Sequence, residues 1–333
     1  MSRNETRTVV ITGASAGIGR ATGLAFARRG WNVAVLARDP GGLGSAREEI
    51  ELAGGRALTI SADVADAVAI FAAAAQVAQR WSTIDVWINN AMATMFAPVS
   101  DMSPEEFRRI TEVTYLGYVY GTMAALTHMR SRNAGTIVQV GSALSYRAIP
   151  LQSAYCGAKF AIRGFTEALR SELQHENSAV RLAMVQLPAV NTPQFDWARN
   201  RMPRRPQPMG PIHQPEAIAE TIFHASQRPP RELWVGFTSV RAILGTMIMP
   251  GLLDRFLART GYEGQLASEP RRSGEPDNLF DAVSHGHSVH GRFDDRARRK
   301  VAVFNPALTR PAIIFCAAAL VFASAILTLS LFV

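Results

Sequence analysis

The feature that most constrains the fold is an alternation of short apolar runs with helical stretches over residues 1–240. The apolar runs are rich in β-branched residues and continuous, which is typical of strands covered on both faces. Helical stretches between such strands allow them to run parallel, so the pattern predicts a doubly wound, Rossmann-type α/β domain. About seven strands are expected: TVVIT (8–12), NVAVLA (32–37), ALTIS (57–61), IDVWIN (84–89), TIVQVG (136–141), VRLAMVQ (180–186) and ELWVG (232–236). The expected helices lie near 17–29, 42–53, 66–80, 104–131, 152–176 and 215–227.

The pattern changes after this domain. Residues 241–260 are predicted to form an amphipathic helical extension, or a helix pair broken at Pro250-Gly251. Residues 261–310 are rich in Gly, Ser, Asp, Arg and His with little periodicity. Such a composition buries too little apolar surface to order itself, so a flexible polar tether is expected there.

The last stretch, 311–333, contains 23 residues without a charge. A helix of that length reaches about 35 Å, enough for a hydrocarbon core of about 30 Å. Basic residues precede it: Arg296, Arg298, Arg299, Lys300 and Arg310. The positive-inside rule then predicts a single C-terminal transmembrane helix with the body of the protein in the cytoplasm. A buried C-terminal helix or a helix between subunits is the alternative. The N-terminus has too short an apolar run for a signal peptide.

Charge and cysteine content exclude some classes of protein. The net charge of +8 owes much to two basic blocks, 199–208 and 292–300. Basic blocks can contact nucleic acid or anionic lipid, but 33 of the 35 basic residues are arginine, and a generally arginine-rich surface explains them. We expect no nucleic-acid partner. The two cysteines, Cys156 and Cys316, exclude a disulfide framework.

The segment TGASAGIG (12–19) follows the first expected strand and opens the first helix. Its glycines, Gly13, Gly17 and Gly19, let the backbone approach a pyrophosphate, and the helix N-terminus offers unpaired N–H groups. The segment therefore predicts a dinucleotide site. Other residues expected to line it are Ser15, Ala16, Ile18, Val64, Asn90 and Ala91.

The second strand ends in VLARDP, where an NAD-selecting fold places a carboxylate for the ribose 2′-OH. Ala37 and Arg38 stand there instead. Arginine suits a 2′-phosphate, so NADP(H) is favoured, and NAD(H) is possible if Asp39 reaches the ribose. Asp63, after the third strand, is expected to accept from the adenine amino group or to cap the next helix.

Tyr155 and Lys159 stand four residues apart in an expected helix, so both project from one face. A nearby ammonium stabilises a phenolate and lowers the tyrosine pKa, which makes the phenol a usable acid or base. Ser142 ends the fifth strand and can stabilise a developing oxyanion. Lys159 and Lys300 are the two lysines of the chain, so a position that resists arginine is consistent with a compact charge being needed.

TGASAGIG, the NNA of 89–91, Ser142 and Tyr155-x-x-x-Lys159 together resemble the short-chain dehydrogenase/reductase family. The resemblance covers roughly residues 6–240. It implies a nicotinamide cofactor and hydride transfer between an alcohol and a carbonyl. Tyr155 would be the acid/base, Ser142 would polarise the carbonyl, and Lys159 would bind the nicotinamide ribose. The family commonly pairs through the helices near 104–131 and 152–176, which implies a homodimer or homotetramer.

Two positions depart from the family pattern. Thr114 stands where the family usually has an asparagine that holds a relay water. The usual Pro-Gly after the sixth strand is Pro188-Ala189, with Val190 and Thr192 beyond it. By the resemblance Pro188, Val190 and Thr192 would contact the nicotinamide, and Thr114 remains a candidate for the relay.

These residues predict an NADP(H)-dependent oxidoreductase acting on a carbonyl or alcohol. The substrate is expected to be lipophilic, because mostly apolar residues should line its side of the site and the chain is expected to lie at a bilayer. A membrane-tethered NADP(H)-binding scaffold with little turnover is the alternative. No metal site is expected, since His285, His287 and His290 lack a regular ligand spacing.

Overall fold

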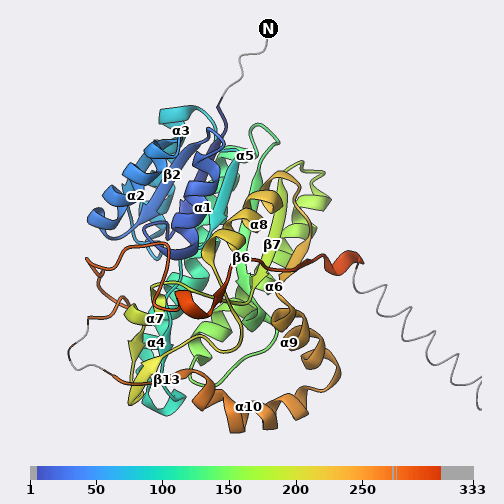
Figure 1. The fold of residues 1–333 in the computed structure, drawn as a ribbon. Coiled ribbons are helices and arrows are strands. Elements are labelled where there is room, and N and C mark those ends of the chain that lie inside the picture. The colour runs from blue at the N-terminus through green and yellow to red at the C-terminus, as the bar shows by residue number, and fades with distance from the viewer. Residues whose placement is uncertain (1–5, 272–273, 275, 309–333) are drawn as a thin grey trace, which may run out of the picture.

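The computed structural model describes residues 6–271, 274 and 276–308. An eight-stranded sheet in the order β15-β12-β7-β6-β4-β1-β2-β3 forms the centre of the molecule (Figure 1). Seven strands run parallel, as the sequence predicts, and β15 joins antiparallel to β12. The strands are β1 (Thr8–Thr12), β2 (Asn32–Ala37), β3 (Arg56–Ser61), β4 (Val86–Asn89), β6 (Thr136–Ser142), β7 (Arg181–Leu187), β12 (Glu232–Val235) and β15 (Val303–Phe304).

Helices cover both faces of this sheet. Side chains such as Phe26, Ile50 and Ile222 bury one face under α1 (Gly17–Ala27), α2 (Pro40–Leu52) and α8 (Pro215–Gln227). The other face lies under α3 (Ala67–Trp81), α5 (Gly117–Met129) and α6 (Ser153–His175). Both faces being apolar explains why the strand sequences show no alternation. The order in which strands are added to the sheet reverses between β1 and β4, and such folds bind ligands at this point.

The helix expected over 104–131 has three parts. It begins as α4 (Pro104–Thr111), where Ser103 and Glu106 form a capping box. A π-helical turn, Glu112–Leu116, then leads into α5. A π turn adds a residue to one helical turn and frequently marks a functional site, and here it contains Thr114.

Several short strands complete the edge of the domain above the ends of the parallel strands. β5 (Met95–Phe96) pairs with β9 (Arg199–Asn200), and β10 (Arg204–Pro206) pairs with β13 (Leu266–Pro270). β8 (Ala189–Val190), β11 (Ile212–His213) and β14 (Ala297–Arg298) form a third small sheet. A single turn, α7 (Gln194–Trp197), lies between β8 and β9.

The extension predicted for 241–260 is a helix pair, α9 (Phe237–Ile248) and α10 (Pro250–Gly264). The break falls at Met249, one residue before the proline, because the residue preceding a proline avoids the helical conformation. The pair lies at the end of the molecule away from the N-terminus (Figure 1).

The expected flexible tether is wrong for most of its length. Residues 276–305 return across the domain, where Leu279, Val283 and Phe293 are buried, and the chain ends this return as strand β15 of the main sheet. The composition misled because a few buried apolar side chains and many backbone hydrogen bonds hold the segment. Among the described residues, no helix has the length and apolarity needed to span a bilayer. The stretch 311–333 lies outside the described residues.

Candidate active site

Two cavities meet at the carboxyl ends of the parallel strands. The nucleotide cavity, of about 970 Å³, has the glycine segment and Arg38 in its wall. The catalytic cavity, of about 1120 Å³, has Ser142, Tyr155 and Lys159 in its wall. Ile18, Asn90, Met92, Thr192 and Gln194 line both. The two cavities therefore adjoin, which suits a cofactor in one and a substrate in the other.

The glycine segment has the backbone that a pyrophosphate site needs. Gly13 and Gly17 have φ values of 66° and 55°, a left-handed conformation that other residues adopt at a cost. A Cβ on Gly19 would lie 2.6 Å from Asn90 Nδ2. That amide donates to the carbonyl oxygens of Thr12 and Gly13, at 3.0 and 3.1 Å, and fixes the turn. Close packing therefore fixes the turn beside the cavity, and the glycines that line this cavity fit a dinucleotide cofactor.

The predicted cofactor residues are mostly brought together. Those in the wall of the nucleotide cavity are Gly13, Ser15, Ala16, Gly17, Ile18, Arg38, Asp63, Val64, Asn90, Ala91 and Thr192. Pro188 and Val190 line the catalytic cavity instead, beside the catalytic residues. Gly19 lies in neither wall and acts through close packing under the turn.

Both carboxylates considered for cofactor contacts have partners within the protein. Asp39 caps α2 by accepting from Gly42 N at 2.5 Å. Asp63 accepts from Ala65 N at 2.9 Å and forms an ion pair with Arg109. The N-cap of α3 is Asp66 rather than Asp63.

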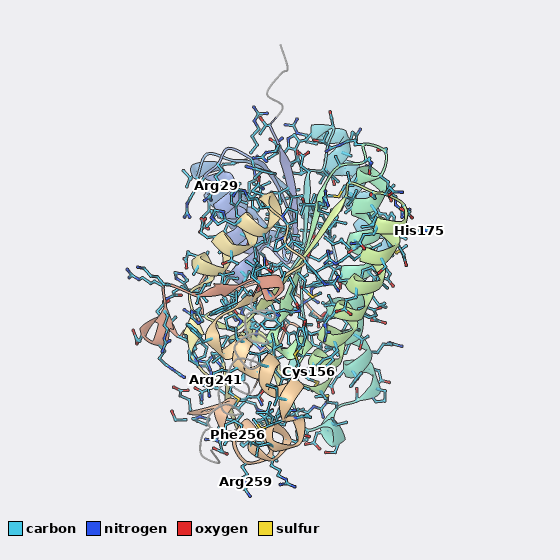
Figure 2. All side chains as sticks on the ribbon, turned by 90° about the vertical axis from the view of Figure 1, so that its right-hand side faces the viewer. Arg29, Cys156, His175, Arg241, Phe256 and Arg259 are labelled. Carbon is cyan, nitrogen blue, oxygen red and sulfur yellow. The ribbon has the colours of Figure 1, made fainter. Side chains whose placement is uncertain are left out.

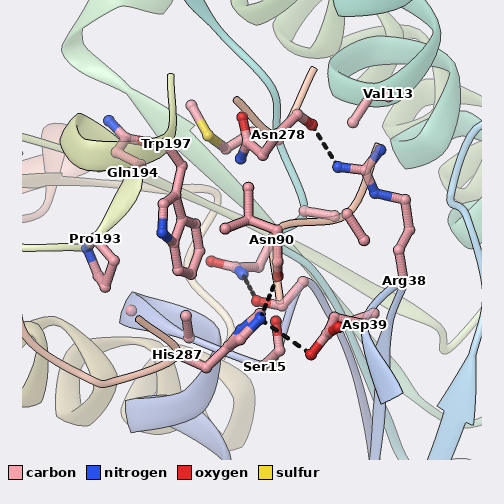
Figure 3. A pocket seen from close by; sticks show the side chains of 18 of the residues that line it. Ser15, Arg38, Asp39, Asn90, Val113, Pro193, Gln194, Trp197, Asn278 and His287 are labelled. Atoms are coloured by element: carbon pink, nitrogen blue, oxygen red, sulfur yellow. Dashed lines mark hydrogen bonds and ion pairs between the residues drawn. The ribbon is translucent and has the colours of Figure 1, made fainter. Parts of the chain in front are cut away.

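A C-terminal strap, residues 277–293, closes the outer side of the nucleotide cavity (Figure 3). The guanidinium of Arg38 donates to the backbone oxygens of Asn278 and Phe280, the latter at 2.8 Å. Gly17 N donates to Ser288 O at 2.8 Å, so the strap also reaches the glycine segment. The strap was missed from the sequence because part of its binding uses main-chain oxygens, which have no residue signature, and its side-chain partners lie far away in the sequence.

The strap is fitted to the domain at its centre and at both ends. His287 lies 3.1 Å from Asp39 Oδ2. Its ring packs at a tilt against Trp197, with 5.0 Å between ring centroids. A Cβ on Gly42 would come within 2.5 Å of the His287 ring. Arg199 holds Asp277 at 2.8 Å, and Arg292 donates to Pro206 O at 2.6 Å. Of the other histidines, His290 pairs with Glu216 at 2.6 Å.

Lys159 lies one helical turn beyond Tyr155 on α6 and is 2% exposed. Its Nζ donates to Val140 O at 2.8 Å and to the Tyr118 hydroxyl at 3.1 Å. The ammonium lies 5.5 Å from the centre of the Tyr155 ring. Burial lowers the pKa of Lys159 to about 7.

Tyr155 is half-buried, and desolvation raises its pKa while a hydrogen bond with Ser142 opposes that rise. The expected lowering of this pKa by Lys159 is therefore wrong for the structure as it stands, because burial outweighs it. The phenol is therefore protonated at neutral pH, the form that can donate a proton to a carbonyl oxygen. Ser142 is positioned from two sides: its hydroxyl accepts from Leu144 N at 3.1 Å, and its own N–H donates to Gln186 Oε1 at 2.8 Å.

Two residues near these groups were missed by sequence reasoning. Gln186 lies buried on β7, and its Nε2 donates a hydrogen bond to Glu232 Oε1 at 2.8 Å. Tyr118 lies four residues beyond Thr114, and its hydroxyl donates to Val140 O at 2.9 Å while accepting from Lys159. The signal available in the sequence was the tyrosine four residues after Thr114 in the same expected helix.

Thr114 is not brought to either cavity wall. Its hydroxyl donates to Ala93 O at 2.9 Å and accepts from Ala93 N at 3.0 Å. The hydroxyl thus acts as donor and as acceptor to Ala93, and both bonds attach the π turn to the chain after β4. The side chain next to Lys159 is instead Tyr118.

Comparison with known proteins agrees with this geometry. The family model described as short chain dehydrogenase matches residues 7–202. The chain belongs to the short-chain dehydrogenase/reductases. It is an oxidoreductase of that family, with the Rossmann-type parallel sheet described above.

Three relatives of this short-chain dehydrogenase/reductase are informative. An uncharacterized oxidoreductase, YxnA of Bacillus subtilis, is 31% identical over 306 residues, covering 91% of this chain and 85% of that protein. The 3-dehydrosphinganine reductase of Danio rerio is 30% identical, covering 64% and 66%. An alcohol dehydrogenase from the archaeon Thermococcus sibiricus, solved with 5-hydroxy-NADP, has a TM-score of 0.59 and 29% identity, covering 69% of this chain and 96% of that one.

Proposed function

We propose that this enzyme transfers hydride between NADP(H) and a lipophilic carbonyl or alcohol, with Ser142, Tyr155 and Lys159 as its catalytic residues. The observation that carries the proposal is the lining of the catalytic cavity. Its walls contain no Asp, Glu or Arg among the described residues, and Lys159 is the one charged group there. The rest of the wall is mostly apolar: Met92, Leu144, Ile149, Leu187, Phe195 and Met209. Such a wall favours an uncharged, apolar substrate body.

The roles of the three residues follow from their chemistry. In the direction of reduction, the Tyr155 hydroxyl donates its proton to the carbonyl oxygen as that oxygen becomes an alcohol. The Ser142 hydroxyl donates a hydrogen bond to the same oxygen and stabilises its developing charge. The Lys159 ammonium stabilises the phenolate that remains on Tyr155. NADPH, when bound, supplies the hydride for the carbonyl carbon.

NADP(H) is the proposed cofactor because Arg38 directly follows β2, where a 2′-phosphate would lie, and because the archaeal neighbour was solved with an NADP derivative. Arg38 would hold the 2′-phosphate, while Asp39 is engaged as a helix cap and with His287. The Ile18 N–H at the N-terminus of α1 would hold the pyrophosphate, since the Gly17 N–H already donates to Ser288 O.

A membrane setting is part of the proposal. The sequence of 311–333 supports a C-terminal anchor with the catalytic domain in the cytoplasm, and the zebrafish relative is named for reduction of 3-dehydrosphinganine. We also propose a homodimer or homotetramer. Exposed apolar residues on the helices that pair in the family, Phe107, Met123 and Phe160, support that assembly.

The test is oxidation of NADPH by the purified enzyme with a panel of lipophilic carbonyls. We expect turnover with some member of the panel and, for Tyr155→Phe, a loss of roughly 100-fold or more because the proton donor is gone. NADPH binding, followed by fluorescence, should survive that substitution. Binding without any oxidation, unchanged in Tyr155→Phe, would support the scaffold alternative instead.

A further inference from the structure

The outer face of the α9–α10 pair carries the largest gathering of exposed apolar side chains on one unit of the described chain. Ile248, Leu252 and Phe256 are 71%, 58% and 53% exposed, and Phe237, Met247 and Met249 lie exposed on the same pair. Soluble surfaces rarely keep such residues together without a partner. We propose that this face docks on the surface of an anionic phospholipid bilayer, as a contact separate from the stretch 311–333.

The pair is amphipathic in the way that a docked element must be. On the inner side Ile243 packs with Tyr146 and Trp234, and Gly261 lies against Pro150. Leu257 is also buried, one turn before Gly261. Leu252 and Phe256, one turn apart, point away from these contacts, and Arg255 and Arg259 form the adjacent stripe of α10.

The charges on this face decide which partner fits it. Arg241, Arg255 and Arg259 are exposed, and among the described residues none of them has an ion pair. The two acids of the pair are engaged elsewhere, Asp254 with Arg147 and Glu263 with Arg204. In Figure 2 Phe256 and Arg259 lie at the lower end of the molecule, and Arg241 lies above them, at about the height of Cys156.

An apolar stripe flanked by unneutralised arginines matches the boundary between acyl chains and anionic headgroups. The same charges disfavour a second copy of this chain, because a symmetric contact through this face would bring Arg255 and Arg259 of both copies together. The charge pattern therefore commits the face to an anionic lipid surface.

The position of the face also suits the proposed substrate. The inner side of α9 contributes Thr238, Ser239 and Ala242 to the wall of the catalytic cavity. A bilayer lying on the outer side would thus be one helix away from Ser142 and Tyr155. The described chain ends near the start of α9, where the Phe304 and Phe237 ring centroids are 5.0 Å apart. Delivery of substrate rests on the proposed function, whereas the docking itself does not.

The docking is tested by hydrogen–deuterium exchange on the full chain with phosphatidylcholine vesicles, with or without phosphatidylglycerol. We expect slower deuterium uptake across 245–260 when phosphatidylglycerol is present, whatever the state of 311–333, because that stretch carries no charge to distinguish the two lipids. Arg255→Ala with Arg259→Ala should weaken this protection roughly tenfold or more. Val68→Asp, at an exposed apolar position on α3, is the matched surface control and should leave the protection intact.

Two results would overturn the inference. One is the same uptake over 245–260 with both kinds of vesicle and without vesicles. The other is protection that grows with protein concentration in the absence of lipid, which would mean that a second copy covers the face. The measurement needs no turnover, so a wrong substrate class would leave it unaffected. Thermal unfolding of the arginine variants at the wild-type temperature would show that they are folded.

Discussion

Lys159 holds an ammonium in a buried position between the Tyr118 hydroxyl and the Val140 carbonyl oxygen. Two neutral acceptors solvate the charge less well than water does, which is why its pKa falls to about 7. The proposed role of the ammonium, to stabilise the Tyr155 phenolate, accounts for burying a charge at this cost. The residue scale therefore predicts two effects, one on stability and one on the reaction.

The first effect concerns stability against pH. The folded protein binds the Lys159 proton only below about pH 7, whereas the unfolded chain binds it up to the ordinary value of 10.5. Between these values the unfolded chain holds more protons, so this residue makes the free energy of unfolding rise with pH. Urea unfolding between pH 7 and 10 measures this effect. The free energy of unfolding should rise by up to about a few kcal/mol more in the enzyme than in Lys159→Met. Equal slopes would show that the lysine is solvated in the folded state.

The second effect concerns Tyr118. Tyr118→Phe removes one acceptor of Lys159 and should lower the pKa of that lysine further, so less ammonium remains to stabilise the Tyr155 phenolate. We expect the alkaline rise of alcohol oxidation to move to higher pH, with a rate loss of about tenfold at neutral pH. A variant that loses stability but keeps the wild-type pH profile would make Tyr118 a packing residue only. Tyr120→Phe, on the same helix, is the matched control.

At the scale of elements, the strap 277–293 and helix α2 approach each other at a glycine. Gly42 leaves room for the His287 ring, whereas a Cβ on Gly44, two residues on, would meet no atom within 4 Å. The contact is therefore a close fit rather than a consequence of a glycine-rich helix. The strap in turn holds Arg38, the residue proposed to bind the 2′-phosphate.

This pair of glycines gives a matched experiment. Gly42→Ala should push His287 away, loosen the strap and raise the dissociation rate of NADPH several-fold. Gly44→Ala should leave NADPH binding unchanged and stabilise the helix by about 0.5–1 kcal/mol, as alanine does in place of an exposed helical glycine. Stopped-flow release of NADPH and thermal unfolding measure both. Identical release rates in the two variants would show that the strap does not control the release of NADPH.

At the scale of the whole molecule, the segment after α10 closes the structure. It pairs with β10, crosses the nucleotide cavity, and adds β15 to the edge of the main sheet. A chain of this family that ended with its parallel sheet would lack that outer wall. The domain and its C-terminal segment therefore form one folding unit, ending near Leu308 in the described residues.

Two truncations test this unit. A chain ending at Leu308 should stay folded, bind NADPH normally and be extracted without detergent if 311–333 is the anchor. A chain ending at Pro270 should lose the strap and β15 and bind NADPH at least tenfold more weakly, because Asn278, Val283 and His287 would no longer wall the nucleotide cavity. Normal NADPH affinity in the shorter chain would assign the strap no part in binding. Detergent dependence that persists in the chain ending at Leu308 would point to another membrane contact.

The sequence by itself determined the parallel sheet, its helices and the local motifs, because strand periodicity, the glycine turn and the Tyr155–Lys159 spacing are encoded within a few neighbouring residues. Those predictions depend on short-range chemistry. The site as a whole, including the roles of its residues, stays a prediction. What the tertiary structure decided depends on residues far apart in the chain: Tyr118 meets Lys159 across 41 positions, and Asn278 meets Arg38 across 240. The strap bonds in part through main-chain oxygens that every residue carries, so its composition suggested a tether. Only the folded chain shows which of those oxygens find a partner.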